Sequence, residues 1–153
     1  MSQIEQRLHE LGYELPTAPV AAGNYLPYRV SGNQLFLSGV LPIRDGQISH
    51  IGKVGREQDE QAGYEAARNC VLTALPNIKA ALGSLDRVRQ VLLVSGYVNG
   101  VDGFENSPQV INGASDFLVE LFGDTGRHAR AAVSVSGLPK NVTVELQITL
   151  EFE

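Results

Sequence analysis

The 153-residue chain has little of what disulfide-stabilised, metal-binding or membrane-spanning proteins depend on. It has one cysteine, Cys70, so no disulfide framework forms within it and no cysteine cluster is available to a metal ion. Its histidines, His9, His50 and His128, are scattered too widely to suggest a metal site. No apolar run reaches the roughly 18 residues of a membrane span. The sequence therefore predicts neither a metal site nor a membrane-spanning helix.

Positive charge is also scarce, because 12 lysines and arginines face 17 aspartates and glutamates, giving a net charge of −5. Proteins that bind the nucleic-acid backbone usually carry basic faces, and no basic run occurs here. The sequence also lacks the phosphate-loop, dinucleotide-binding, zinc-protease and serine-hydrolase motifs. Nucleic-acid binding is therefore not expected to be the main role.

What is present is the composition of a folded protein, with 43% hydrophobic and 19% charged residues. The length fits one domain over residues 1–153, in which residues 1–22 form an N-terminal helix and an extended loop. The first residues are charged and helix-like rather than typical of a signal peptide, so the cytoplasm is the expected location. Cys70 falls within a helical pattern, where a core residue is the simplest interpretation.

Apolar residues at helical spacing predict two longer helices. The first runs from about Gln58 to Leu82, and Pro76 is expected to kink or interrupt it because proline removes a backbone donor. The second starts at Ser107 or Asn112 and ends before Gly123. Turn signals, alternation and apolar runs predict a hairpin over residues 28–39, a second turn at Asp45-Gly46, and strands within residues 87–100, 128–136 and 142–152. Helices interleaved with strands in this order predict an α+β fold with the helices on one face of a sheet.

Alternation along the last strands assigns polar residues to faces. Val142, Val144 and the later even-numbered residues should face the helices, which leaves Glu145 on the helix-free face. The same reasoning applied to Ala131 and Val133 puts Arg130 on the helix-free face. That face would meet water, or it would be a subunit interface where an arginine binds the carboxylate of a protein or a ligand.

Three motifs resemble one family. They are "GNQLFLSGVLP" at residues 32–42, "VINGASDFLVELFG" at 110–123 and "HARAAVSVSGLPKNVTVELQITLEF" at 128–152. Together they resemble the reactive-intermediate deaminase family, also called the Rid, YjgF or L-PSP endoribonuclease-like family. The resemblance runs from about Asn24 to the end. The N-terminal helix lies outside it, which suggests a divergent branch.

The resemblance implies a chorismate mutase-like fold, with a mixed, mostly antiparallel sheet and two helices on one face. It also implies a homotrimer with clefts between subunits, and an enamine and imine deaminase activity. In that reaction 2-aminoacrylate or 2-iminopropionate is hydrolysed to a 2-keto acid and ammonia. The reaction needs no metal or organic cofactor, and the expected ligand is a small imino or keto acid.

The same resemblance implies roles for five residues of this chain. Arg130 matches the family's substrate-carboxylate clamp, and Glu145 matches the acidic residue that positions or activates water. Ser38, Tyr25 and Asn112 match substrate-binding positions. Four of them also have a specific alternative interpretation: an ion pair for Arg130, a solvated strand position for Glu145, replacement of Tyr25 by Tyr28, and a helix cap for Asn112.

Ala132 departs from the family pattern, which often has a cysteine there, and this leaves the substrate range open. His128 is either an additional pocket group or a surface residue. Two other functions also stay open: a trimer that binds a small carboxylate without converting it, and an endoribonuclease. The binder would need only Arg130, whereas a catalyst would need Glu145 as well. The acidic composition counts against the endoribonuclease.

Overall fold

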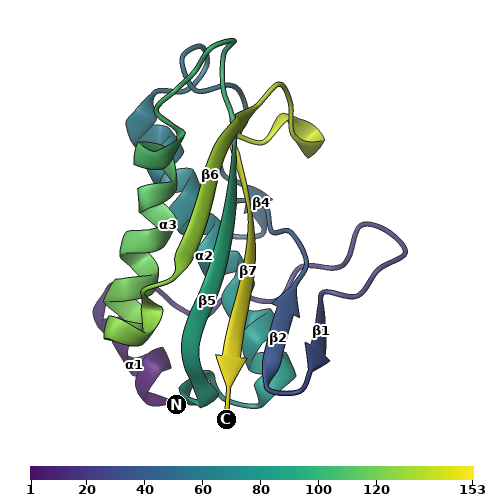
Figure 1. The fold of residues 1–153 in the computed structure, drawn as a ribbon, viewed down its shortest axis with the longest axis vertical. Helices are drawn as coiled ribbons and strands as arrows, with labels where there is room; N and C mark the ends of the chain where they lie inside the picture. The colour runs from purple at the N-terminus through teal and green to yellow at the C-terminus, as the bar shows by residue number, and fades with distance from the viewer.

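A five-stranded sheet forms one layer of the protein, and two long helices cover one face of it (Figure 1). The computed structural model describes residues 1–153. The strand order is β1-β2-β7-β5-β6, with β5 parallel to β6 and every other pair antiparallel. The strands are β1 (Tyr28–Ser31), β2 (Gln34–Leu37), β5 (Val88–Asn99), β6 (Ala129–Val135) and β7 (Val144–Phe152). This arrangement confirms the predicted α+β fold with a mixed, mostly antiparallel sheet.

Two hairpins occupy the predicted turns. β1 and β2 are joined at Gly32, whose φ of 60° is in the left-handed region. A second, two-stranded sheet pairs β3 (Ile43–Arg44) with β4 (Gln47–Ile48). Its turn places both Asp45 and Gly46 at positive φ, a conformation that asparagine, aspartate and glycine tolerate best. Residues 14–27 form no helix or strand, in agreement with the predicted loop.

Helix α2 (Glu60–Leu82) begins at Asp59, whose carboxylate accepts a hydrogen bond from the Ala62 amide, and ends at Gly83. The expected interruption at Pro76 is wrong, because the helix continues through it to Leu82. The residues from Asn69 to Ile78 are all buried. We attribute the continuity to this burial, since tertiary packing of a helix can outweigh the loss of one backbone donor.

Helix α3 (Ser107–Phe122) starts at the earlier of the two predicted positions, with Pro108 in its first turn, where a proline costs no hydrogen bond. It ends at Gly123, as predicted. Asn112 therefore lies inside the helix. The interpretation of Asn112 as a helix cap is wrong.

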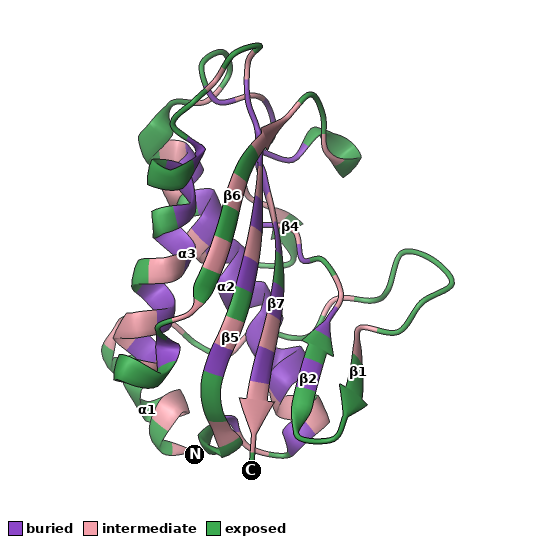
Figure 2. Cartoon of the chain, in the orientation of Figure 1, coloured by how far each residue is buried: buried purple, intermediate pink, exposed green.

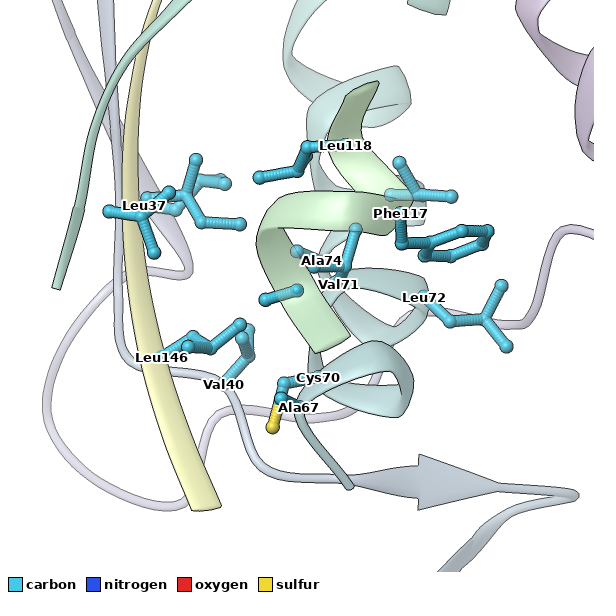
Figure 3. Close-up of a cluster of buried hydrophobic side chains, with 14 of the residues drawn as sticks. Leu37, Val40, Ala67, Cys70, Val71, Leu72, Ala74, Phe117, Leu118 and Leu146 are labelled. Atoms are coloured by element: carbon cyan, nitrogen blue, oxygen red, sulfur yellow. The ribbon is translucent and has the colours of Figure 1, made fainter. Parts of the chain in front are cut away.

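The hydrophobic core lies between the sheet and these two helices. The even-numbered residues of β7 up to Leu150, and Val142 two positions before the strand, are buried, as the alternation predicts: Val142, Val144, Leu146, Ile148 and Leu150. Figure 3 shows Leu37 and Leu146 from the sheet facing Val71 and Leu118 from the helices. The Cys70 thiol is fully buried in the same cluster, and burial raises its pKa well above the ordinary value. Cys70 is therefore a core residue.

Helix α1 (Gln3–Glu10) packs at the end of the molecule where the two termini lie (Figure 1). Ser2 and Glu5 form a capping box at its start. The amides of Gln3 and Ile4 both donate to the Asp86 carboxylate at 2.9 Å. Asp86 belongs to a short 3-10 turn, η1 (Leu85–Arg87), which leads into β5. The N-terminal segment is thereby tied to the start of a central strand.

The predicted orientation of β6 is wrong. Arg130 faces α3 rather than the helix-free side, because its guanidinium donates to Asn112 and Ser115 of that helix. Val133 points the other way and is 46% exposed. β6 is an edge strand with no buried residue, and Figure 2 colours it only as exposed or half-buried. Its apolar side chains therefore do not mark the core face, which is the assumption that the prediction made.

Candidate functional site

The residues predicted for the site separate into two groups. Tyr25, Ser38 and Glu145 lie together beside the helix-free face of the sheet. Arg130 and Asn112 lie on the other side, between β6 and α3. Each group has its own chemistry.

The first group lines an open hollow of about 560 Å³. β7 contributes Glu145, and β5 contributes Tyr97, which lies directly opposite Glu145 in the strand pairing. The loop before β1 contributes Tyr25, and the segment after β2 contributes Ser38 and Gly39. Segments far apart in the sequence thus meet around one carboxylate.

Glu145 is half-buried and has no cation partner. Burial raises the pKa of its carboxyl above the ordinary value of 4.5. No protein group donates a hydrogen bond to it, and every ion pair of the structure involves other residues. A carboxylate in this condition has unused acceptor capacity and a greater tendency to take a proton. These are the properties of a general base.

Gly39 makes room for this carboxylate. A Cβ atom at position 39 would overlap an oxygen of Glu145, whereas glycine leaves the space open. The backbone of Gly39 is not at positive φ, so the requirement concerns space and not conformation. The sequence motif contained this glycine, but its contact with a residue more than 100 positions away was not visible there.

Ser38 and Tyr25 both line the hollow, and the hydroxyl group of each makes one hydrogen bond within the chain. The Ser38 hydroxyl donates to the carbonyl of Leu26 at 2.6 Å, so its proton holds the loop before β1 and only its lone pairs are free. Tyr25 is 51% exposed and lines the hollow, and its hydroxyl accepts from the Ala22 amide. Tyr28, the alternative tyrosine, packs against the core instead. The loop tyrosine of this hollow is therefore Tyr25.

The second group is a chain of hydrogen bonds that ends on Arg130. Nη1 of Arg130 donates to Oδ1 of Asn112 at 2.8 Å and to Oγ of Ser115 at 3.1 Å. Oγ of Ser115 lies 2.8 Å from Nε2 of His128, whose Nδ1 lies 2.6 Å from the carbonyl oxygen of Gly126. Arg130 takes part in none of the ion pairs within the chain.

His128 is half-buried with both ring nitrogens engaged, so it is not a plain surface residue. Burial and the nearby Arg130 charge lower its pKa from the ordinary 6.5, although the Gly126 carbonyl acts in the opposite direction. The lowered pKa favours the neutral imidazole at pH 7. Ser115 has no counterpart in the sequence reasoning, although its place three residues after Asn112 puts both on one helix face.

A further hollow, of about 580 Å³, lies at the far end of β6 and is lined by Lys53, Arg56, Phe104 and Ser134, among others. The Lys53 ammonium donates to the side chain of Asn99 and to the carbonyls of Gly100 and Ser136. Its donors are therefore used in joining the loops at this end. No three His, Cys, Asp or Glu side chains gather anywhere to hold a metal ion. None of the helices has the length and hydrophobicity to cross a membrane.

Comparison with known proteins identifies the fold. Residues 5–151 match the family model described as "YjgF/chorismate_mutase-like, putative endoribonuclease". The chain belongs to this YjgF-like family. The match includes most of helix α1, which the sequence resemblance had left outside the family pattern.

Solved structures separate two degrees of similarity within the YjgF-like family. The protein Atu1372 from Agrobacterium tumefaciens, whose function is given as unknown, is 43% identical over 98% of this chain and 92% of its own, with a TM-score of 0.92. A protein described as a putative endoribonuclease from Shewanella oneidensis MR-1 is 34% identical over 99% of this chain and 100% of its own, with a TM-score of 0.95.

The protein RidA from the Antarctic bacterium Psychrobacter sp. PAMC 21119 is more distant. It is 25% identical over 88% of this chain and 94% of its own, with a TM-score of 0.62. The chain thus shares its fold closely with one set of YjgF-like proteins and more loosely with RidA.

Proposed function

We propose that this YjgF-like protein is an imine deaminase that hydrolyses small imino acids, such as 2-iminopropionate and 2-aminoacrylate, to 2-keto acids and ammonia. The observation that carries the proposal is a pair of unpartnered charges: an arginine without a carboxylate and a glutamate without a cation. Hydrolysis of an imino acid would use both groups. Its carboxylate suits Arg130, and the water that attacks its imine carbon suits Glu145.

The reaction needs positioning and one proton relay. Arg130 binds the substrate carboxylate, which places the imine carbon. Glu145 takes a proton from water as the oxygen bonds to that carbon. That proton passes to the imine nitrogen, which gives a carbinolamine. The proton of its new hydroxyl group then moves to the amino nitrogen, the carbon–oxygen double bond forms as the carbon–nitrogen bond breaks, and the keto acid and ammonia leave. Tyr25 and the free lone pairs of Ser38 border the hollow and can hydrogen-bond water or substrate. No cofactor takes part in this proposal.

The proposal also includes a homotrimer with a cleft at each interface. Arg130 and Glu145 of one chain lie on opposite sides of the sheet, so a site that contains both requires two chains. The helix-free side exposes apolar side chains that a second copy would cover: Phe36, Leu93 and Val133. We propose the cytoplasm as the location, because the first residues are charged and helix-like.

The test is to generate 2-iminopropionate in situ and to measure pyruvate release. The wild-type protein should accelerate release above the spontaneous rate, and Arg130→Ala should lose the acceleration. If the folded wild type does not exceed the spontaneous rate with this substrate or with 2-aminoacrylate, the deaminase proposal fails.

A trimer that binds a small carboxylate without converting it is the second candidate. It is favoured by the separation of the two groups, since the Arg130 group is complete within one chain and does not involve Glu145. Calorimetric binding of pyruvate by a protein without turnover would support this candidate. An endoribonuclease remains a weak alternative because of the net charge of −5.

A further inference from the structure

In the series of hydrogen bonds that ends on Arg130, the Gly126 carbonyl determines which atom donates and which accepts at each step. Gly126 offers a carbonyl oxygen, which can only accept, so Nδ1 of His128 carries the proton. In the neutral ring Nε2 then has the lone pair and accepts from the Ser115 hydroxyl. With its proton directed to His128, Oγ of Ser115 presents lone pairs to Arg130.

The backbone of Gly126, whose carbonyl oxygen is the first acceptor in this series of hydrogen bonds, is fixed in place by packing. A Cβ atom at Gly126 would overlap the backbone carbonyl of Leu118, so the turn is packed directly against α3. Ser115 lies on the same helix, and Asn112 is one turn before it. The acceptors that face Arg130 therefore all rest on α3 or on the turn packed against it.

As a result, Nη1 of Arg130 is held by hydrogen bonds within the protein, and the opposite edge of the guanidinium is free. Nη1 donates to both Asn112 and Ser115, which uses its two hydrogens. Nε and Nη2 have no acceptor within the protein. The edge formed by these two nitrogens is the one that binds a carboxylate through two parallel hydrogen bonds.

We propose that Ser115 and His128 are positioning residues for the Arg130 carboxylate clamp. They do not contact the substrate. His128 orients the Ser115 hydroxyl, and Ser115 together with Asn112 holds the guanidinium with its carboxylate-binding edge exposed before the ligand arrives. This inference rests on the proposed role of Arg130 in carboxylate binding.

The matched test exploits the two nitrogens of His128. In His128→Gln the side-chain amide reaches the place of Nε2 and can still accept from Ser115. In His128→Asn the amide reaches only the place of Nδ1, so Ser115 loses its acceptor. His9→Asn is the control, because His9 is an exposed residue bonded to Glu14 of the N-terminal segment.

Pyruvate binding by calorimetry should weaken about tenfold in His128→Asn and Ser115→Ala, since each loses a hydrogen bond that supports a charged group. His128→Gln and His9→Asn should bind within about twofold of wild type. With 2-iminopropionate the weakening should appear in KM and leave kcat nearly unchanged, because the clamp binds substrate and transition state alike.

A second measurement needs neither substrate nor turnover. The Nε–H bond of Arg130 in the free protein, followed by ¹⁵N relaxation, should be ordered in wild type and His128→Gln and mobile in His128→Asn and Ser115→Ala. Unchanged order in the last two variants, or unchanged pyruvate affinity while Arg130→Ala loses binding, would overturn the positioning role. Absence of turnover in a wild type with an ordered Arg130 would instead reject the deaminase and leave the positioning role standing.

Discussion

At the scale of single residues, the proposed chemistry depends on Glu145, whose charged form is disfavoured by burial in the folded protein. Burial raises the pKa of Glu145, so folding disfavours its charged form. Below the ordinary pKa of 4.5 the carboxyl is protonated in both the folded and unfolded states and costs nothing. As the pH rises through the raised pKa of the folded state, the protein loses stability relative to one without this group.

Glu145→Gln should therefore change activity and stability in opposite directions. We expect kcat/KM for 2-iminopropionate to fall about 100-fold, the range for loss of a general base. Thermal unfolding at pH 4 and pH 7 should show a variant that gains stability over wild type at pH 7 and gains little at pH 4. Equal melting temperatures at pH 7 would contradict the account of burial.

Gly39→Ala tests the space around the same carboxylate. The new methyl group would displace the end of the Glu145 side chain, which can rotate away, so the fold should survive. Turnover should fall roughly tenfold, because misplacement of a catalytic group is costly even over short distances. Gly137→Ala is the matched control, since a Cβ at that glycine meets nothing within 4 Å. Equal activity in both variants would show that the position of Glu145 does not matter.

At the scale of elements, alternation predicted the face of each side chain correctly in a strand with one buried face, and it failed in a strand with no buried residue. β7 lies inside the sheet with one face on the core, so strict alternation identified its helix-facing residues. β6 lies at the edge, and its more apolar side is the exposed one, so the same reasoning turned Arg130 to the wrong face. The predicted interruption at Pro76 failed for a related reason, because the sequence pattern does not show how completely the helix around a proline is buried.

The N-terminal helix offers a test at this scale. Asp86 accepts hydrogen bonds from the first two amides of α1, so it acts as a remote cap on that helix. Asp86→Ala should destabilise the protein by about 1 kcal/mol, the usual effect of losing a helix cap. Chemical denaturation provides the measurement. Asp102→Ala, which removes an exposed carboxylate that makes no hydrogen bond or ion pair, should leave the unfolding free energy unchanged.

At the scale of the whole molecule, the separation of the two groups is the finding that the sequence could not supply. Alternation along the last two strands placed Arg130 and Glu145 on the same helix-free face. In the structure those strands are separated by β5, and the two side chains lie on opposite sides of the sheet. The family fold was recognisable because its motifs are local. The distribution of a site between chains is a property of assembly, which no single chain displays.

The proposed trimer should depend on the apolar side chains of the helix-free face. Val133→Lys would place a charge among them, and we expect mainly monomers by analytical ultracentrifugation together with loss of turnover. Gln109→Lys, on the exposed side of α3, introduces the same charge away from that face and should leave the assembly intact. A trimer unaffected by Val133→Lys would show that the subunits meet elsewhere.

The most direct test of a site shared between chains is to mix two inactive variants. Arg130→Ala and Glu145→Gln subunits would be unfolded together, refolded as mixed trimers and assayed with 2-iminopropionate. If each cleft takes its arginine from one chain and its glutamate from the next, random mixing leaves about a quarter of the clefts intact, so roughly a quarter of wild-type activity should return. A mixture no more active than its inactive parents, beside a wild type that refolds to full activity, would contradict the shared site.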